Sequence, residues 1–410
     1  GWSPAQIIHP DLYEILAHTE GVVVFHEQVI QIIATMTGVS LATADEKRRS
    51  LGDRAGQQEV CDWFFPAATV KGYELPIIQE IWDVLRAFAS FGFCKAHAAA
   101  FALPTYQSAW LKTHYPAAFL AGVLTHDPGM YPKRLIVDEA RQMGITIAPI
   151  DVNASDSLYR VEDHGNAIRI ALSTVSGISD GEVQSIIAGR PYIDLNDFVR
   201  RSGCSTPVTE SLILTGGFDS LHADVNRRDL LLHFSDLQKS PSAAVSGAQM
   251  NLGFEPPALI SSGLPAMTAA ESVKYEVDRL GIDMSRHMIE FYGDFLNAIG
   301  AVRSSDLLKQ RSQSSVLVAG IKVAMQTPPV RSGKRVIFLT LDDGYGLSDS
   351  TFFTDVQGEY ANVLYSTSLL LVRGITRRTG ARGISIRATG AWDLRAAYES
   401  WSAKQSTLAI

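Results

Sequence analysis

Residues 91–130 read FGFCKAHAAAFALPTYQSAWLKTHYPAAFLAGVLTHDPGM, the most unusual pattern in the chain. The glycine in the opening FGF lets the chain reverse, so that Lys95 and His97 come at the start of an alanine-rich helix. A helix N-terminus favours anions through its free N–H groups and its dipole. Lys95, His97 and this helix end can therefore hold a phosphate together.

Aromatic and polar side chains follow in the same segment at near-helical spacing, namely Tyr106, Gln107, Trp110 and Lys112. Pro104 lies close enough to kink the segment. Two interpretations fit this spacing: a surface that stacks on bases and contacts phosphates, or the buried face of an ordinary helix. Spacing alone favours the buried face.

Helical patterns continue on the N-terminal side of this segment. Apolar side chains recur every three or four residues at 27–36 and at 77–88, as in helices with one buried face. Between them, Arg48 and Arg49 belong to a basic triplet near the end of a short helix. The triplet can complement the helix dipole, or its guanidinium groups can clamp a phosphate with paired hydrogen bonds.

Length and composition place the chain among globular proteins. Its 410 residues allow two to four domains, and 46% hydrophobic with 19% charged residues excludes a disordered, collagenous or coiled-coil chain. We find neither an apolar run long enough to span a membrane nor the order of a signal peptide, and we expect a cytoplasmic protein without a membrane partner. The start at Gly1, without methionine, leads us to expect a missing upstream part.

Cysteine and histidine usage argues against a metal site. The three cysteines are far apart, which fits neither a disulfide framework nor a four-thiolate zinc site. The ten histidines are scattered, without HExxH or a pair at ligand spacing. We therefore predict a reducing compartment and no metal bound by these residues.

Charge is unevenly distributed. The net charge is -7, yet residues 311–390 hold ten Lys or Arg and five Asp or Glu. One segment is therefore basic while the rest of the chain is acidic. A polyanion partner for the basic segment and a chance fluctuation of charge explain this difference equally well.

Residues 171–187 combine a short helix, a turn and a second helix, as in a helix-hairpin-helix. The turn contains Gly177, Ser179 and Gly181, whose small size would let backbone N–H groups approach one DNA phosphate closely. Such a contact does not depend on base sequence. A Gly-x-Ser turn is less specific than Gly-x-Gly, and many ordinary helical hairpins fit the pattern.

Beyond residue 315 the apolar period becomes two, with five β-branched or aromatic runs separated by Gly and Asp turns. Five short strands of this kind fit an oligonucleotide-binding (OB) barrel, and a barrel used only for packing is the alternative. Its exposed basic positions are expected to be Lys322, Arg331, Lys334, Arg335, Arg373, Arg377, Arg378 and Arg387.

The fold class is therefore multidomain α+β. We expect a helical region at 1–160, a helix-hairpin-helix domain at 161–234, a flexible linker at 235–268, a helical connector at 269–310, a five-stranded OB-type barrel at 311–395 and a C-terminal tail at 396–410.

Several of these segments, in this order, together resemble the bacterial DNA polymerase III alpha subunit. They are HEQV at 26–29, FGFCKAH at 91–97, TYQSAWLK at 105–112, HYPAAFLAGVLT at 114–125, RQMGI at 141–145, DVN at 151–153, GGFDSL at 216–221, KYEVDRLGI at 274–282 and FLTLDD at 338–343. The segments up to residue 153 resemble the fingers, and nearly the whole chain is covered. Cys94 before Lys95, and a chain that stops soon after the barrel, resemble the error-prone branch more than the replicative one.

The resemblance implies template-directed DNA synthesis by two-metal nucleotidyl transfer. By position, Arg48, Arg49, Lys95 and His97 would contact the incoming deoxynucleoside triphosphate or support residues that do. The carboxylates that bind Mg²⁺ in this family belong to a palm upstream of residue 1, so we expect no catalytic residue here. DNA contacts are expected from Lys112, Gly177, Ser179, Gly181, Lys322, Lys334, Arg335, Arg377 and Arg378.

Two departures from the family pattern weaken individual contacts. Asp53 stands where relatives often have a basic residue, and Ser179 replaces the second turn glycine. Asp342 and Asp343, at the end of a barrel strand, are interpreted as turn-forming residues, not as metal ligands.

Implied partners are primer-template DNA, single-stranded template, a deoxynucleoside triphosphate, and a sliding clamp or an accessory damage-tolerance protein, at the nucleoid. The alternative is a non-catalytic module that binds single-stranded DNA or a protein partner.

Overall fold

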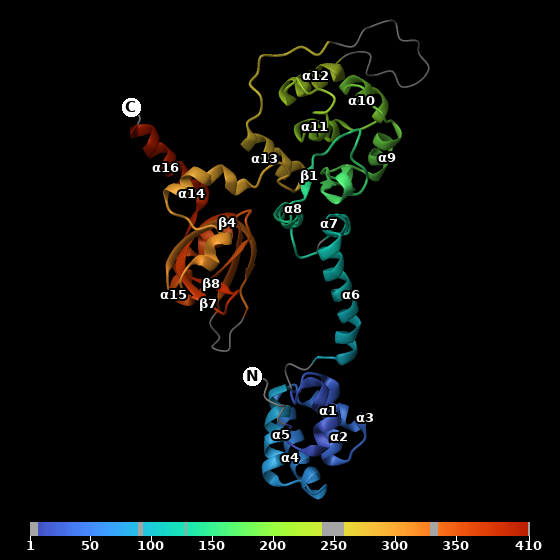
Figure 1. The fold of residues 1–410 in the computed structure, drawn as a ribbon, viewed down its shortest axis with the longest axis vertical. Coiled ribbons are helices and arrows are strands. Elements are labelled where there is room, and N and C mark those ends of the chain that lie inside the picture. Colours follow the sequence, from blue (N-terminus) through green and yellow to red (C-terminus); the bar gives the residue numbers. More distant parts are fainter. Residues whose placement is uncertain (1–6, 89–92, 128, 240–257, 329–334, 409–410) are drawn as a thin grey trace. The chain divides into compact units, whose positions relative to one another are not determined.

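The computed structural model describes residues 7–88, 93–127, 129–239, 258–328 and 335–408 (Figure 1). The chain divides into two compact units, Gly1–Trp110 and Leu111–Ile410. The helical region expected at 1–160 is therefore not one domain. Part of the FGF turn, Lys334 and most of the expected linker, residues 240–257, lie outside the described residues.

The first unit is helical. Its elements are η1 (Pro10–Leu12), α1 (Tyr13–Leu16), η2 (Ala17–Thr19), α2 (His26–Thr37), α3 (Leu41–Ser50), α4 (Arg54–Val70), α5 (Leu75–Phe88) and the first part of α6 (Lys95–His114). The two amphipathic patterns predicted from the sequence form α2 and α5, and their apolar faces share one core with α4 through Ile33, Phe64 and Ile78. Gly38, with φ of 76°, ends α2 in the left-handed region that glycine adopts without strain.

Helix α6 corrects the prediction of a buried aromatic face. None of its side chains is buried among the described residues, and the exposed fraction is 69% for Tyr106 and 44% for Trp110. The helix continues through Pro104. The recurring aromatic residues therefore lie at the surface of this structure.

The second unit begins with α7 (Pro116–Thr125) and α8 (Lys133–Gln142), and a small mixed sheet follows. In the described ranges, β1 (Thr146–Ala148) pairs in parallel with β3 (Ala167–Arg169), and β2 (Arg160–Glu162) pairs antiparallel to β3. The helical region expected at 1–160 did not predict this sheet. Short 3-10 turns, η3 (Asp163–Gly165) and η4 (Leu172–Thr174), precede the next helices.

Helices then complete this part of the unit: α9 (Asp180–Ala188), α10 (Leu195–Ser202), α11 (Thr206–Leu214), α12 (Arg227–Lys239) and α13 (Ala269–Leu280). One core runs through the whole part, with Leu124 of α7, Ile168 of β3, Phe198 of α10 and Leu212 of α11 among its buried members. Residues 117–152 thus pack in one core with the helix-hairpin-helix region that lies beyond the predicted boundary at 160.

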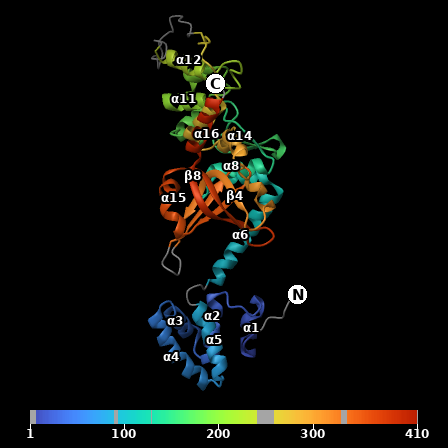
Figure 2. The same cartoon turned by 90° about the vertical axis from the view of Figure 1, so that its left-hand side faces the viewer.

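The predicted barrel is confirmed. Within the described residues of the C-terminal part, a closed barrel has the strand order β4-β5-β6-β8-β7. The strands are β4 (Ser315–Gln326), β5 (Ile337–Asp342), β6 (Leu347–Phe352), β7 (Leu369–Arg378) and β8 (Ile384–Asp393), and α15 (Thr354–Ser366) lies along the outside of the barrel (Figures 1 and 2). As described, β6 and β8 close the barrel in parallel through the pairs Ser350–Ile386 and Thr351–Arg387.

The C-terminal segment is a helix and not a tail. Helix α16 (Leu394–Leu408) packs against the connector, which holds η6 (Met288–Tyr292), α14 (Gly293–Ala298) and η7 (Ser304–Lys309). The Phe295 ring centroid lies 5.9 Å from that of Tyr398 and 5.5 Å from that of Trp401. These contacts cover the part of the outer barrel surface formed by Ala319 and Leu371.

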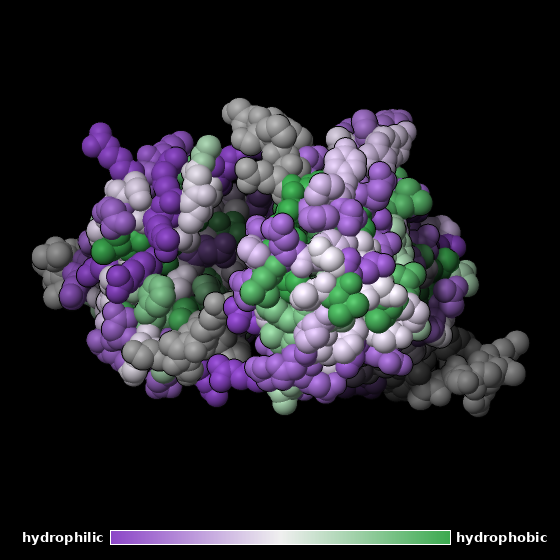
Figure 3. Space-filling view, turned by 90° about the horizontal axis from the view of Figure 1, so that it is seen from below, coloured by the Kyte–Doolittle hydropathy of each residue, from purple (hydrophilic) through white to green (hydrophobic). Residues whose placement is uncertain are grey.

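On the face drawn in Figure 3, apolar and hydrophilic side chains are interspersed. Among the helices in the described ranges, none combines the length and apolar character that a membrane span needs.

Candidate nucleotide and nucleic-acid interface

The N-terminus of α6, where the sequence predicted a phosphate, is capped by a carboxylate of this chain. Glu27, in the first turn of α2, accepts the Lys95 backbone N–H with Oε1 at 3.0 Å and Oε2 at 2.9 Å. Cys94 Sγ also donates to Oε1, at 3.4 Å. Partial burial raises the pKa of Glu27, but these donors outweigh it and hold the pKa below its usual value.

The two side chains predicted to bind phosphate here have different surroundings. Lys95 Nζ lies 3.2 Å from His18 Nε2 and 5.8 Å from the centroid of the Phe25 ring. The His97 ring packs edge-on against Phe101, with centroids 4.6 Å apart. The structure therefore places Lys95 against the first helices and His97 in an aromatic row along α6.

Arg48 and Arg49, in the last turn of α3, bind one carboxylate. Arg48 Nε lies 2.9 Å from Asp45 Oδ1, and Arg49 Nη2 lies 2.8 Å from Asp45 Oδ2. These hydrogen bonds, first that from Arg48, lower the pKa of Asp45. Because the Arg48 side chain is 22% exposed and that of Arg49 is 73% exposed, a phosphate would reach Arg49 first.

The turn before α9 has the backbone that a close phosphate contact needs. Gly177 has φ of +81°, and a Cβ added there would meet nothing within 4 Å. A Cβ added at Gly181 would meet Ser179 Oγ at 3.9 Å and nothing nearer. The chain's own packing therefore leaves open space beside both glycines, while the backbone angle at Gly177 favours glycine.

Ser179 has a structural role in this turn. Its Oγ accepts the Glu182 N–H at 3.2 Å, and Glu182 Oε2 accepts the Ser179 N–H at 2.9 Å, which makes a capping box at the start of α9. The backbone N–H of Ser205 binds the other oxygen of Glu182, and these donors lower the pKa of Glu182 to about 2. Ser179 thus stabilises the start of α9.

A groove with a volume of about 260 Å³ lies on the barrel beside the seam between β6 and β8. Arg377 of β7, Arg387 of β8 and Phe353 after β6 are among its lining residues. The Arg387 guanidinium lies 5.4 Å from the Phe353 ring centroid, and Phe353 is 39% exposed. Ile375, opposite Arg387 in the strand register, adds apolar surface. A cation beside an exposed aromatic ring suits the phosphate and base of a single strand.

Neighbouring basic residues that the sequence grouped together divide into two kinds. Arg377 lines the groove, whereas the Arg378 guanidinium donates to the backbone oxygens of Leu308 and Gln310 and so ties β7 to η7. Lys322 Nζ donates to the Leu364 backbone oxygen at 2.7 Å, and burial lowers its pKa. Arg378 and Lys322 are thus held by the barrel itself.

The other basic candidates differ in the same way. Lys112 Nζ pairs with Glu139 Oε1 at 2.6 Å. Arg335 is exposed beside the start of β5. Phe353 was not among the predicted site residues. The doublet Phe352-Phe353 held the signal, because successive residues of extended backbone point to opposite faces, so one ring can be buried and the other exposed.

Asp342 and Asp343 do not fit a catalytic metal pair. Asp343 Oδ2 accepts the Ser304 N–H at 2.7 Å and its Oδ1 accepts the Tyr345 N–H at 3.0 Å. Asp342 Oδ1 accepts the Gly344 N–H at 3.0 Å. Both form the turn as predicted, and their oxygens are used by protein donors.

Comparison with known proteins identifies the two helical parts of the chain. Residues 1–68 match the bacterial DNA polymerase III alpha subunit finger domain, and residues 144–230 match a helix-hairpin-helix motif. The chain is 32% identical over 429 residues to an error-prone DNA polymerase of Symbiobacterium thermophilum, a match that covers 92% of this chain and 39% of that protein. The chain belongs to the bacterial DNA polymerase III alpha family. Arg48 and Arg49 lie inside the finger match, and the turn glycines lie inside the helix-hairpin-helix match.

Both branches of the DNA polymerase III alpha family are represented among these relatives. The DNA polymerase III subunit alpha of Pasteurella multocida is 32% identical over 387 residues, covering 89% of this chain and 33% of that protein. The error-prone DNA polymerase of Nocardia farcinica is 31% identical over 383 residues, covering 91% and 33%. The chain thus spans between a third and two fifths of the length of these relatives.

Proposed function

We propose that this chain is part of an error-prone, DNA-directed DNA polymerase, in which it supplies contacts to the incoming nucleotide and to DNA. The similarity to polymerases along about nine tenths of the chain carries this proposal. Cys94 before Lys95 supports the error-prone branch, while the identity of 32% is the same for a relative of each branch. A non-catalytic binding module is less favoured, because the relatives that match about nine tenths of the chain are polymerases.

On the nucleotide side, the cationic groups act by electrostatic attraction. Arg49 offers a largely exposed guanidinium, and Lys95 and His97 lie at the start of α6. Because Glu27 occupies the helix N–H groups, the triphosphate of a deoxynucleotide would be bound by these side chains and not by the helix end.

On the DNA side, two surfaces contribute. The open backbone at Gly177 and Gly181 would bind a phosphate of primer-template DNA without reading its sequence. The groove with Arg377, Arg387 and Phe353 would hold the single-stranded template by stacking and charge.

Mg²⁺ chemistry is assigned to another part of the polypeptide. When bound, Mg²⁺ would neutralise charge on the transferring phosphate. Asp342 and Asp343 do not fit this ion, because their oxygens accept hydrogen bonds from protein donors. The chain would therefore only position the nucleotide and the DNA. A sliding clamp or an accessory damage-tolerance protein would complete the assembly at the nucleoid.

Fluorescence-anisotropy titration of the 410-residue chain with single-stranded and primer-template DNA, at two salt concentrations, tests the DNA contacts. We expect affinity to fall with salt, because each phosphate contact releases counterions. Replacing both Arg377 and Arg387 by Ala should weaken single-strand binding and reduce the salt slope by about 0.7 for each phosphate that the variant no longer neutralises. Lys404→Ala, at an exposed position of α16, is the control for the loss of a surface cation.

Unchanged binding in the double variant would remove the groove from the DNA site. No binding of either DNA at low salt would contradict the DNA role of these parts and favour a protein partner for the barrel.

A further inference from the structure

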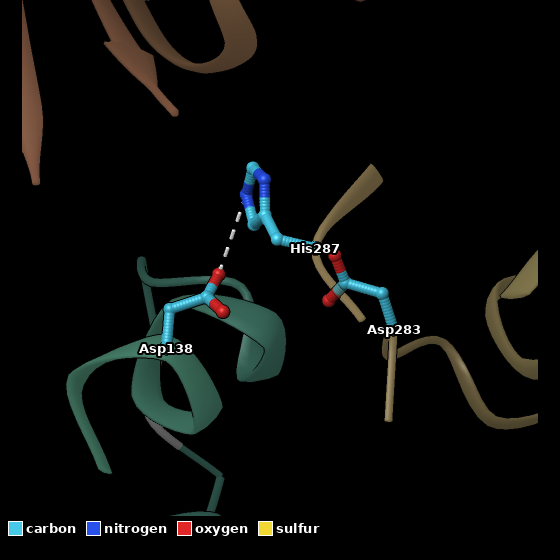
Figure 4. A group of neighbouring side chains, drawn as sticks. All are labelled: Asp138, Asp283 and His287. Atoms are coloured by element: carbon cyan, nitrogen blue, oxygen red, sulfur yellow. Dashed lines mark ion pairs between the residues drawn. The ribbon is translucent and has the colours of Figure 1, made fainter. Parts of the chain in front are cut away.

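A buried ionic cluster joins α8, residues 283–287 and the end of β5. Its members are three carboxylates, two arginines and one histidine: Asp138, Asp283, Asp342, Arg134, Arg141 and His287. The carboxylates and the histidine are at most 3% exposed. Figure 4 shows Asp138 on α8 and the neighbouring Asp283 and His287 extending toward one another.

The contacts of the cluster link the barrel to the helical part of the second unit. His287 Nε2 lies 3.4 Å from Asp342 Oδ2 and 3.6 Å from Asp138 Oδ2. Arg141 Nη1 pairs with Asp138 Oδ1 at 2.5 Å, and Arg134 Nη1 lies 3.8 Å from Asp342 Oδ2. Two carboxylates from different elements thus face the same ring nitrogen.

The charges do not balance. With every carboxylate ionised and His287 neutral, the two arginines leave the cluster at -1, summed from its six members. An uncompensated charge is costly in a site closed to water. One further positive charge, a proton or a metal cation, would cancel it.

The orientation of the His287 ring disfavours both a second ring proton and a metal ion bound to Nε2. Its Nδ1 accepts the Ile289 backbone N–H at 3.3 Å, so Nε2 carries the ring proton and points it at the carboxylates. A metal on Nε2 would move that proton to Nδ1, and a second ring proton would also be placed there. Either change would set two donors, Nδ1–H and the Ile289 N–H, against each other.

The additional positive charge is therefore expected on the carboxylates. Among the described residues, Asp138 Oδ2 and Asp283 Oδ1 are buried and have no hydrogen-bond partner. One ligand-type atom from each of Asp138, Asp283 and His287 lies within 4.8 Å of the others. A proton on Asp138 would both restore neutrality and give one of these oxygens a bond to make.

We propose that Asp138 is a neutral carboxylic acid below neutral pH, and that losing this proton as the pH rises loosens the joint between the barrel and α8. Burial raises the pKa of Asp138 to about 7, the neighbouring Asp283 and Asp342 carboxylates add to this rise, and burial also raises the pKa of Asp283. Because the pKa of Asp138 in the folded state lies above its ordinary value of 3.8, the folded state binds the proton more tightly than the unfolded chain does. The resulting stability is greatest in acid and declines as pH rises from about 4 to about 7.

Hydrogen exchange of the full 410-residue chain between pH 5 and pH 8.5, corrected for intrinsic exchange, tests this joint. We expect protection of residues 283–292 to fall as pH rises toward the pKa of Asp138, approaching tenfold per pH unit, and to level off above it. In Asp138→Asn the amide is neutral at every pH, so this dependence should disappear and protection at pH 8.5 should equal or exceed that of the parent. Asp278→Asn, exposed on α13, should behave like the parent.

If ionised Asp138 instead serves only as the partner of Arg141, residues 283–292 should be less protected in Asp138→Asn than in the parent at every pH. This result would overturn the proposal. Infrared spectroscopy of the unmodified chain does not depend on the variant folding. A buried carboxylic-acid carbonyl band that is present at pH 6 and lost by pH 8.5 is expected, and its absence would overturn the proposal. A gain in protection on adding Mn²⁺ or Zn²⁺ to the parent, and not to Asp138→Asn, would also overturn it in favour of a cation.

Discussion

Glu27 binds the backbone N–H of Lys95 with both carboxylate oxygens, at 3.0 and 2.9 Å. One side chain from the first turn of α2 thereby closes the N-terminus of α6. A triphosphate brought to this helix end would meet a negative charge, so the side chain of Lys95 must supply the attraction that the helix itself no longer offers.

Removing this cap should destabilise the first unit. We expect Glu27→Ala to lower the free energy of unfolding by about 1 kcal/mol, as for other helix caps, and Glu27→Gln to cost less because one acceptor remains. The pKa of Glu27 is lowered in the folded state, so its contribution is present above the ordinary pKa of 4.5 and is lost as pH falls through the folded pKa. Urea unfolding at pH 7 and pH 3.5 measures this, with exposed Glu14→Ala as control; an equal loss from Glu27→Ala at both pH values would contradict it.

Lys95→Ala and His97→Ala, made in the intact polymerase, should lower nucleotide incorporation far more than DNA binding. Both residues begin α6, where the family resemblance places the triphosphate. Single-turnover incorporation and primer-template affinity are the two readouts. Equal losses in both would show that these residues serve DNA binding or folding.

Gly177 and Gly181 should respond differently to alanine. Gly177→Ala places a side chain at φ of +81° and should destabilise the turn by about 1 to 2 kcal/mol. Gly181 lies inside α9 beside open space, so Gly181→Ala should leave thermal stability unchanged or raise it, and yet weaken duplex binding by holding the phosphate away. Undiminished DNA affinity in a stable Gly181→Ala chain would exclude this backbone from the interface.

Arg377 and Arg378 should separate binding from stability. Arg378→Ala removes bonds to two backbone oxygens of the segment around η7 and should lower the melting temperature by a few degrees. Arg377→Ala should leave the melting temperature unchanged and weaken single-strand binding. Anisotropy and thermal unfolding of both variants measure these effects. The assignment is refuted if Arg377→Ala lowers the melting temperature and Arg378→Ala weakens only single-strand binding.

Phe353→Ala should weaken single-strand binding by about 1 to 3 kcal/mol, the usual loss when a stacking ring is removed. Phe353→Tyr keeps the ring and should bind like the parent. Phe352→Leu, which alters the buried partner of the doublet, is the control for barrel packing.

Periodic patterns predicted those elements that bury a long apolar face. The five barrel strands, helices α2 and α5, and the turn around Gly177 all followed from spacing and turn chemistry. The repeat at Leu394, Ala397, Tyr398 and Trp401 also has helical spacing, so α16 was within reach of the same reasoning. Three-residue strands such as β1 are too short to show a period, and the small sheet therefore could not be predicted.

The site was less accessible to such reasoning, because a list of basic residues does not say which oxygen each one meets. Arg378 and Arg377 are adjacent, yet one binds backbone oxygens of a distant segment and the other faces the groove. Glu27 and Lys95 are far apart in the chain, and so are Asp138 and His287. Contacts of this kind arise from the tertiary fold alone.

The short parallel seam of the barrel has a mechanical consequence. In the described strands, β6 and β8 are joined at Ser350–Ile386 and Thr351–Arg387, whereas β7 and β8 pair along nearly their whole length. When the barrel is heated or pulled, the β6–β8 pair should separate first, because it has the fewest paired residues. The groove with Phe353 and Arg387 lies across this pair. A DNA strand bound in this groove would hold β6 and β8 together. The barrel should therefore be more rigid with DNA bound and open locally more often without it.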